Sequence, residues 1–135
     1  MTRFVVDARA ALRLAGTGTA VPDVHTLLAP TLLRSQVLST MHEAVHRGEV
    51  AAADARRQVA AVGRLRIRLL GDAVLRGTAW QVADRLGWAS TFDAEYVALT
   101  LLQGDALVTL DGALARAASP EVRTAPFEAL LDPTA

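Results

Sequence analysis

The chain has 135 residues and a formal net charge of zero, with 14 basic and 14 acidic side chains. This length corresponds to one domain, and an apolar content of 52% is enough for a full hydrophobic core, which excludes bulk disorder. The chain has no cysteine, so disulfides and cysteine-ligated metal sites are excluded. All 14 basic residues are arginines, which excludes chemistry that requires a lysine, such as a P-loop or a Schiff base.

The amino-terminal segment lacks the pattern of a secretory signal, because its apolar stretch ends at Asp7. No apolar run approaches the roughly 20 residues that a membrane helix requires. We therefore expect a cytoplasmic protein with no membrane partner.

The predicted elements alternate between strands and helices along the chain. The apolar run at 4–6 is typical of a buried parallel strand, and further strands are expected at 27–30 and 106–110. Residues 66–70 are a strand candidate with partial alternation, and a last edge strand is expected at 121–124. Helical patterns lie at 8–15, 31–47, 49–62, 72–86, 92–103 and 112–118. The alternation predicts an α/β fold, a three-layer α/β/α sandwich with a mostly parallel central sheet, formed by a single domain over residues 1–135. We expect the tail after about residue 125 to be loosely packed.

Three aspartates occupy comparable places in this pattern. Asp7 and Asp111 each follow an apolar strand, and Asp93 lies at the start of a helix. Ligands of an open parallel sheet bind outside the carboxyl ends of its strands, so two of these side chains point to where a site would form. The structural alternative is that each aspartate is an N-cap, with Ser90 pairing with Asp93. Spacing alone leaves both interpretations open.

The residues around these aspartates resemble three motifs of the PIN-domain family, in the order of the family. The motifs are Phe-Val-Val-Asp-Ala at 4–8, Thr-Phe-Asp-Ala-Glu-Tyr-Val-Ala-Leu at 91–99 and Leu-Val-Thr-Leu-Asp at 107–111. Residues 29–37 look like the segment that leads into the helix bearing the family's second acid. The resemblance covers residues 4 to about 117, and it is most relevant to the ribonuclease toxins of bacterial VapBC-type toxin–antitoxin systems.

The resemblance implies a metal-dependent endoribonuclease that cleaves RNA with Mg²⁺ or Mn²⁺ in an acidic pocket. Asp7, Asp93 and Asp111 would be both the catalytic acids and the metal ligands. Thr109 would orient Asp111 or a bound water. Hard oxygen ligands of this kind suit Mg²⁺.

The chain departs from the family at Gln36, where the family usually has a glutamate. The amide is neutral, so one negative charge is missing from the pocket. Glu43 and Glu95 are the nearest replacements, but helical geometry makes each a doubtful ligand. This departure leaves open a second interpretation, a catalytically weakened or inactive PIN domain that acts as a binding module.

The resemblance also implies partners, namely a cognate antitoxin, an RNA substrate and a second copy of the chain. The antitoxin would bury an apolar segment in a groove of the domain. Family members often dimerise through their early helices. The helix predicted over 31–47 has one apolar face, which serves either the core or a dimer. That face consists of Leu33, Val37, Met41 and Val45.

Residues 42–46, His-Glu-Ala-Val-His, match the helical zinc-protease pattern. Helical periodicity places His42 and His46 on the side of the helix away from its apolar face. We therefore interpret them as surface residues and keep a zinc metallohydrolase, with Glu43 as its base, as the least favoured alternative.

Arg64, Arg66 and Arg68 recur at every second residue. Strand alternation would place them on one face, where they could contact RNA phosphates. A solvated strand edge is the alternative interpretation.

Overall fold

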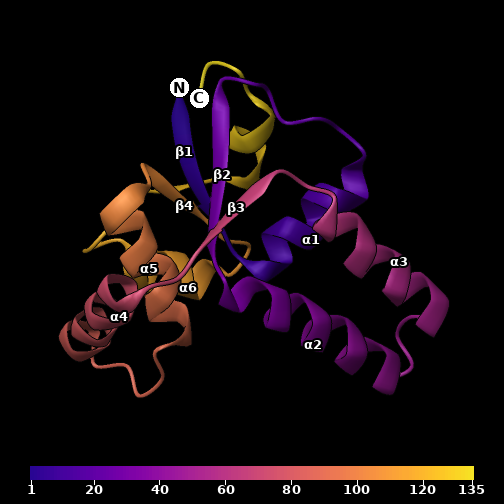
Figure 1. The fold of residues 1–135 in the computed structure, drawn as a ribbon, viewed down its shortest axis with the longest axis horizontal. Helices are drawn as coiled ribbons and strands as arrows, with labels where there is room; N and C mark the ends of the chain where they lie inside the picture. Colours follow the sequence, from indigo (N-terminus) through magenta and orange to yellow (C-terminus); the bar gives the residue numbers. More distant parts are fainter.

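The fold is an alternation of strands and helices around one parallel sheet (Figure 1). The computed structural model describes all 135 residues. The strands are β1 (Thr2–Val6), β2 (His25–Pro30), β3 (Ile67–Leu70), β4 (Ala106–Val108) and β5 (Thr124–Ala125). The helices are α1 (Ala8–Thr17), α2 (Leu32–His46), α3 (Ala52–Gly63), α4 (Ala73–Leu86), α5 (Phe92–Gln103) and α6 (Gly112–Ala118), followed by a 3₁₀ helix, η1 (Phe127–Leu131).

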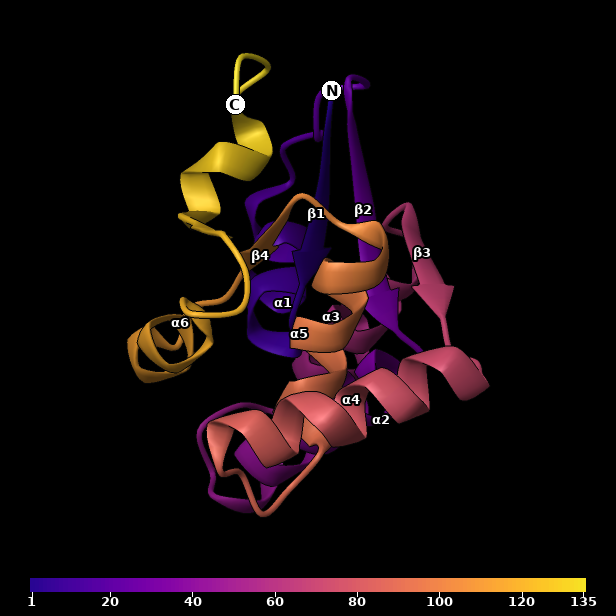
Figure 2. The ribbon, with the colours of Figure 1, turned by 90° about the vertical axis from the view of Figure 1, so that its left-hand side faces the viewer.

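The five strands lie in the order β3-β2-β1-β4-β5, and every neighbouring pair is parallel. The chain therefore moves outward from β1 through β2 to β3 and then returns across the sheet to β4 and β5. Right-handed crossovers place the helices of the two halves on opposite faces. Figures 1 and 2 show α1 and α3 on one side of the sheet and α4 and α5 on the other. The predicted three-layer sandwich is confirmed, with a sheet that is parallel throughout.

The order of the strands reverses between β1 and β4, which pair directly with each other. At such a switch point the connections leave the two strands in opposite directions and open a crevice at their carboxyl ends. Residues 4–6 of β1, its carboxyl half, and residues 106–108 of β4 are apolar and buried. The crevice therefore lies beside the buried centre of the sheet.

The predicted strands and α-helices agree with the structure in number and order, and several of their ends match, but η1 was not predicted. Asp72 is the N-cap of α4, where its Oδ1 accepts a hydrogen bond from the Leu75 amide at 2.8 Å, and Gly87 ends the helix with a φ of 69°. β4 ends at Val108, earlier than predicted, because the next two residues turn toward the crevice. The last strand is shorter and lies later than predicted, at Thr124–Ala125.

The apolar face of α2 serves the core of the domain. Leu33, Val37 and Met41 are buried, and Val45 is half-buried. Leu38, on the other side of the helix, is exposed. None of the helices combines the length and apolar character needed to cross a membrane.

The prediction of a loosely packed tail after residue 125 is wrong. Phe127 and Leu130 are buried in the core, three residues apart on one side of η1. The Asp132 carbonyl lies 2.6 Å from His25 Nε2, and the Thr2 hydroxyl donates to the Ala135 carbonyl at 2.8 Å. The tail therefore closes the amino end of the sheet.

Candidate active site

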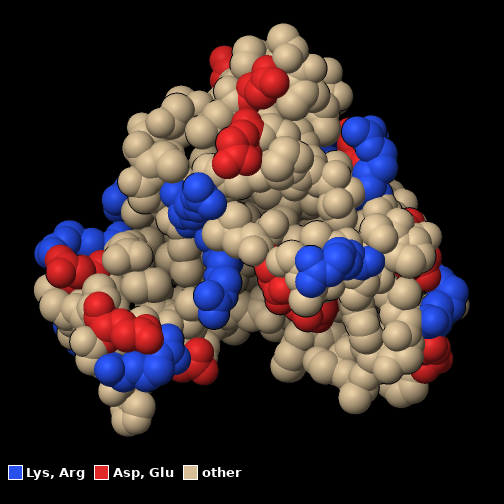
Figure 3. Space-filling model, turned by 180° about the vertical axis from the view of Figure 1, so that it is seen from behind, with Lys and Arg blue, Asp and Glu red and all other residues tan.

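A hollow opens at the carboxyl ends of β1 and β4, and we call it the acidic hollow. Figure 3 shows acidic side chains in the notch at the lower middle of the molecule, with basic side chains on both sides of it. The hollow has a volume of about 290 Å³. Its walls come from α1, α2, α5, α6 and the residues that directly precede α1 and α6. Its lining residues are Asp7, Ala8, Arg9, Gln36, Ser39, Thr40, Glu43, Asp93, Tyr96, Asp111 and Leu114.

Asp7 is held rigidly at the end of β1. Its Oδ1 accepts a hydrogen bond from the Ala10 amide at 2.9 Å, so it is the N-cap of α1. Its Oδ2 accepts a hydrogen bond from the Thr109 hydroxyl. Burial raises the pKa of Asp7, and the negative charge of Asp111 raises it further, while the Thr109 and Ala10 hydrogen bonds lower it.

Asp111 is also an N-cap, at the start of α6. Its Oδ1 accepts hydrogen bonds from the amides of Ala113 and Leu114, at 2.9 and 3.2 Å. The Asp111 amide donates to the Thr109 hydroxyl at 3.1 Å. Thr109 therefore links the Asp7 carboxylate to the backbone of Asp111 and fixes the two acids relative to each other.

Asp93 differs from the other two because no hydrogen bond joins its carboxylate to another protein group. Ser90 does not pair with it; the Ser90 Oγ accepts a hydrogen bond from the Phe92 amide at 3.2 Å instead. Desolvation raises the pKa of Asp93, and the charges of Asp7 and then Asp111 raise it further. The N-cap interpretation therefore holds for two of the three aspartates and fails for Asp93.

The three aspartates line one hollow and repel one another, yet they do not form a finished metal site. No group of three or more His, Asp or Glu side chains converges closely enough to hold an ion. The donor set nevertheless has the chemistry of a divalent-ion site, since it is all oxygen and is rich in carboxylate. Asp93 has no hydrogen bond to lose if its side chain moves toward the other two acids.

Gln36 lies in the acidic hollow at the place where the family's glutamate was expected. Its Oε1 accepts a hydrogen bond from the Tyr96 hydroxyl at 2.5 Å. The Tyr96 ring is buried, and this burial, together with the charges of Asp7, Glu95 and Asp93, raises the pKa of its hydroxyl. The hydroxyl therefore stays protonated and acts as a donor.

Glu43 and Glu95, the two possible replacements for the missing glutamate, lie in different places in the structure. Glu43 lies on the wall of the acidic hollow. Glu95 does not line the hollow; its pKa is raised by desolvation and lowered by the charge of Arg76 on α4. Of the two, only Glu43 is placed to act on something bound beside the aspartates.

Sequence reasoning missed several residues of the hollow. Arg9 is exposed on its rim, where its charge lowers the pKa of Asp7. Tyr96 and Thr40 complete the wall. The position of Arg9 could have revealed it. It is the second residue after Asp7, so it lies in the first turn of the following helix, beside the carboxyl end of the strand. Tyr96 falls within the motif at 91–99, but no local pattern distinguishes a tyrosine of the site from one of the core.

The zinc-protease pattern does not form a site. His42 and His46 are exposed on α2, as predicted. The remaining histidine, His25, lies in β2 and bonds to the tail, with its Nδ1 buried and without a partner. Glu43 belongs to the acidic hollow instead.

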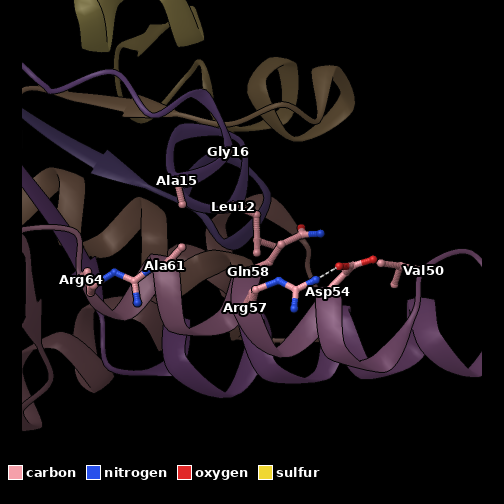
Figure 4. Close-up of a pocket in the computed structure, with 9 residues that line it drawn as sticks. All are labelled: Leu12, Ala15, Gly16, Val50, Asp54, Arg57, Gln58, Ala61 and Arg64. Carbon is pink, nitrogen blue, oxygen red and sulfur yellow. Dashed lines mark hydrogen bonds and ion pairs between the residues drawn. The ribbon is translucent and has the colours of Figure 1, made fainter.

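The arginines at 64, 66 and 68 are exposed, but they do not border the acidic hollow. They lie around the start of β3, toward the amino end of the sheet, and line a separate hollow with Asp23 and His25. Arg64 also borders a hollow between α1 and α3, where Arg57 pairs with Asp54 (Figure 4). An RNA contact at these arginines remains a prediction.

The sequence is similar to two mycobacterial proteins over most of its length. VapC ribonuclease Mb0985 of Mycobacterium bovis and ribonuclease VapC9 of Mycobacterium tuberculosis are each 33% identical to the chain over 111 residues. The similar region covers 80% of this chain and 85% of each relative. No protein-family model matches the chain.

Two solved structures share the fold. PAE2754 of Pyrobaculum aerophilum has a TM-score of 0.77 and 24% identity, over 96% of this chain and 93% of that one. VapBC2 of Rickettsia felis, solved with a fragment of its promoter DNA, has a TM-score of 0.64 and 7% identity, over 92% of this chain and 98% of that one. Identity this low supports the fold alone. The relatives at 33% identity establish the family: the chain belongs to the VapC ribonucleases, which are PIN-domain proteins.

Proposed function

We propose that the chain is a metal-dependent endoribonuclease that acts as the toxin of a toxin–antitoxin pair and cleaves RNA in the acidic hollow. The activity is proposed from the mycobacterial relatives, which are named as ribonucleases. The observation that carries the proposal is the gathering of Asp7, Asp93 and Asp111, from segments far apart in the sequence, around one hollow at the switch point of the sheet.

The electrostatics of the hollow support a cationic ligand. Desolvation raises the pKa of Asp7 and that of Asp93, and the charge of a neighbouring aspartate raises each further. A divalent cation would remove this repulsion. We infer that Asp7, Asp93 and Asp111 would hold Mg²⁺ or Mn²⁺. When bound, the ion would supply a Lewis acid for the charge on the scissile phosphate and a more acidic water.

The protein's own groups support the reaction by holding and orienting. The Ala10 amide and the Thr109 hydroxyl fix both oxygens of Asp7. The amides at the start of α6 fix Asp111. Arg9 is exposed on the rim of the hollow, where its planar guanidinium could donate hydrogen bonds to an RNA phosphate next to the cleaved bond. Hydrolysis adds water across one P–O bond of the backbone.

The proposal is tested by incubating the purified protein with a mixed pool of RNA in Mn²⁺, in Mg²⁺ and in EDTA. We expect cleavage with metal and none with EDTA. Asp93→Asn should lower the rate by on the order of a thousandfold, because it removes a metal-binding charge without removing a hydrogen bond. Asp105→Asn, at the other end of the sheet, is the control and should retain activity. Equal cleavage by wild type and Asp93→Asn would refute the assignment.

A second function is favoured by one observation, the neutral Gln36 whose Oε1 is already bonded to Tyr96. On this alternative the domain binds its partner or RNA without cutting. Gln36→Glu distinguishes the nuclease from the binding module. If this variant cleaves RNA and the wild type does not, the wild type is a binding module. Cleavage by wild type that is lost in Asp7→Ala would exclude it.

We further infer that the chain acts in the cytoplasm and binds a cognate antitoxin. The support is family membership and the fold shared with the VapBC2 complex of R. felis. A homodimer is also proposed from the family, and the exposed Leu38 on α2 leaves apolar surface for it. Sedimentation of the purified chain, alone and co-expressed with the product of the adjacent gene, measures both associations.

A further inference from the structure

A second hollow adjoins the acidic one and differs from it in chemistry. It has a volume of about 490 Å³ and is lined by Gln36, Gly87, Trp88, Ala89, Ser90, Phe92 and Asp93. Gln36 and Asp93 also line the acidic hollow, so the two spaces share a wall. The rest of the lining includes two aromatic side chains, Trp88 and Phe92, and we call this space the aromatic hollow.

The two aromatic side chains have different exposures. Trp88 is half-buried and packs against the core. Phe92, at the first turn of α5, leaves 58% of its surface exposed, so its ring is open to a ligand. The connection that carries them is short and fixed: Gly87 ends α4, the Trp88 amide donates to the Ala83 carbonyl at 2.8 Å, and Ser90 accepts from the Phe92 amide.

The amide of Gln36 is also fixed, and its polarity can be worked out. The buried Tyr96 hydroxyl has one hydrogen-bond partner, Gln36 Oε1. If the amide were turned over, its nitrogen would donate to the hydroxyl oxygen and the hydroxyl proton would have no acceptor, which is costly for a buried group. The oxygen of Gln36 is therefore occupied, while Nε2 has no protein partner and is not sealed from solvent.

We propose that the aromatic hollow is a nucleobase subsite, in which a base next to the cleaved phosphate stacks on Phe92 over Trp88 and accepts a hydrogen bond from Gln36 Nε2. A base has an apolar face and polar acceptors on its edge, which match an exposed aromatic ring beside a fixed amide donor. The shared wall places this base beside the acids. Tyr96 acts as a positioning residue, because it selects the polarity of the amide.

The proposal rests on the proposed function for its choice of ligand, and it is tested by binding rather than cleavage. The protein is Asp7→Asn in Mn²⁺, which blocks the proposed cleavage. The probes are two fluorescent eight-residue single strands, oligouridylate and an abasic ribose-phosphate strand of the same length. We expect the base-bearing strand to bind more tightly. Adding Phe92→Ala should weaken its binding by on the order of tenfold and leave the abasic strand unaffected.

Matched variants separate stacking from a general effect. Phe92→Tyr keeps a ring at this place and should restore the affinity. Trp80→Ala removes another exposed aromatic, on α4, that does not line either hollow, and it should change nothing. Gln36→Ala and Tyr96→Phe should both weaken the binding of oligouridylate and leave the abasic strand unaffected, because each removes or misdirects the amide donor.

Several outcomes would overturn the subsite. These are equal binding of the two probes, equal losses for both probes in Phe92→Ala, or no effect of Phe92→Ala on either. Such results are distinguishable from a failure of the proposed function. A wild type that does not cleave RNA, but whose Phe92→Ala variant loses only base-dependent affinity, would refute the nuclease and retain the subsite. A wild type that cleaves RNA, combined with equal binding of the two probes by the Asp7→Asn protein, would support the nuclease and refute the subsite.

Discussion

The two ends of the parallel sheet use aspartate in opposite ways. At the amino end, Asp105 accepts a hydrogen bond from the Arg3 amide at 2.7 Å and lies 3.9 Å from the Arg3 guanidinium. Asp132 bonds to the hydroxyl and amide of Thr134, and these bonds lower its pKa. At the carboxyl end the pKa of Asp7 and that of Asp93 are raised instead.

The difference shows which acids stabilise the fold and which do not. An acid whose pKa is lowered in the folded protein stabilises that protein at neutral pH, and an acid whose pKa is raised destabilises it. The amino end holds the termini of the chain together, whereas the carboxyl end holds carboxylates that are partly desolvated and face one another's charge. Substitutions at the amino end should therefore cost stability, and substitutions at the carboxyl end should cost function.

The largest effect is expected at the amino end from Leu130→Ala. Leu130 is fully buried in η1, so its truncation leaves a cavity and should lower the free energy of unfolding by about 2–5 kcal/mol. Leu102→Ala, at a side chain that is 42% exposed on α5, is the control and should cost much less. Urea denaturation of both variants measures the difference. Similar midpoints for the two would mean that the tail is not part of the cooperative core.

Gly104→Ala tests how closely the amino end is packed. A Cβ at this position would meet the Val5 Cγ2 at 2.9 Å and the Thr100 Cα at 3.2 Å. The resulting strain should cost about 1–3 kcal/mol in the free energy of unfolding. Gly63→Ala is the matched control, because a Cβ there meets nothing within 4 Å and alanine favours the helix. If the two variants unfold alike, the contact between α5 and β1 is looser than the structure indicates.

The fold could be predicted from the sequence where local signals are strong. Asp72 and Gly87 set the ends of α4, and the continuous apolar run at 4–6 identified a buried strand. The tail was mispredicted because its order depends on His25 and Thr2, which are more than a hundred residues away. A contact of this kind leaves no periodic signal within the tail itself.

The candidate site could be predicted in part. The resemblance selected Asp7, Asp93 and Asp111, and the structure places them around one hollow. The bond between Tyr96 and Gln36 spans 60 residues, so no local pattern could reveal it. Arg64, Arg66 and Arg68 were predicted to share a strand face, but β3 begins at Ile67, so only Arg68 lies in the strand and Arg64 is the C-cap of α3. Spacing in the sequence also carries no information on which end of the sheet these side chains border.

At the carboxyl end, Thr109→Val should reduce RNA cleavage by about tenfold, which corresponds to the loss of one charge-assisted hydrogen bond. Valine keeps the shape of threonine but cannot donate to Asp7 or accept from the Asp111 amide. The rate in saturating Mn²⁺ measures the effect. Thr109→Ser, which retains the hydroxyl, should stay close to wild type. A serine variant as slow as the valine variant would mean that packing, and not the hydroxyl, is what matters.

The smallest effect, and the one that most directly separates the two ends of the sheet, is a gain in stability from Asp93→Asn without metal. Desolvation and the charges of Asp7 and Asp111 raise the pKa of Asp93 in the folded protein. The folded state therefore binds this proton more readily than the unfolded state, and the associated stability is lost as the pH rises through the folded pKa. At neutral pH the carboxylate is a net cost, which the neutral amide removes.

Because Asp93 is exposed and its repulsion is screened, the rise in Tm at pH 7 in EDTA should be on the order of 2 °C. The gain should shrink as the pH falls and should vanish below the ordinary aspartate pKa of 3.8, where the carboxyl is protonated in both the folded and the unfolded chain. Adding Mn²⁺ should raise the Tm of the wild type above that of the variant, since an ion that binds only the folded protein stabilises it. Asp105→Asn should show the reverse pattern, a lower Tm in EDTA and no dependence on Mn²⁺. An Asp93→Asn variant that is less stable than wild type in EDTA at pH 7 would show that the repulsion in the hollow is already relieved by the protein itself.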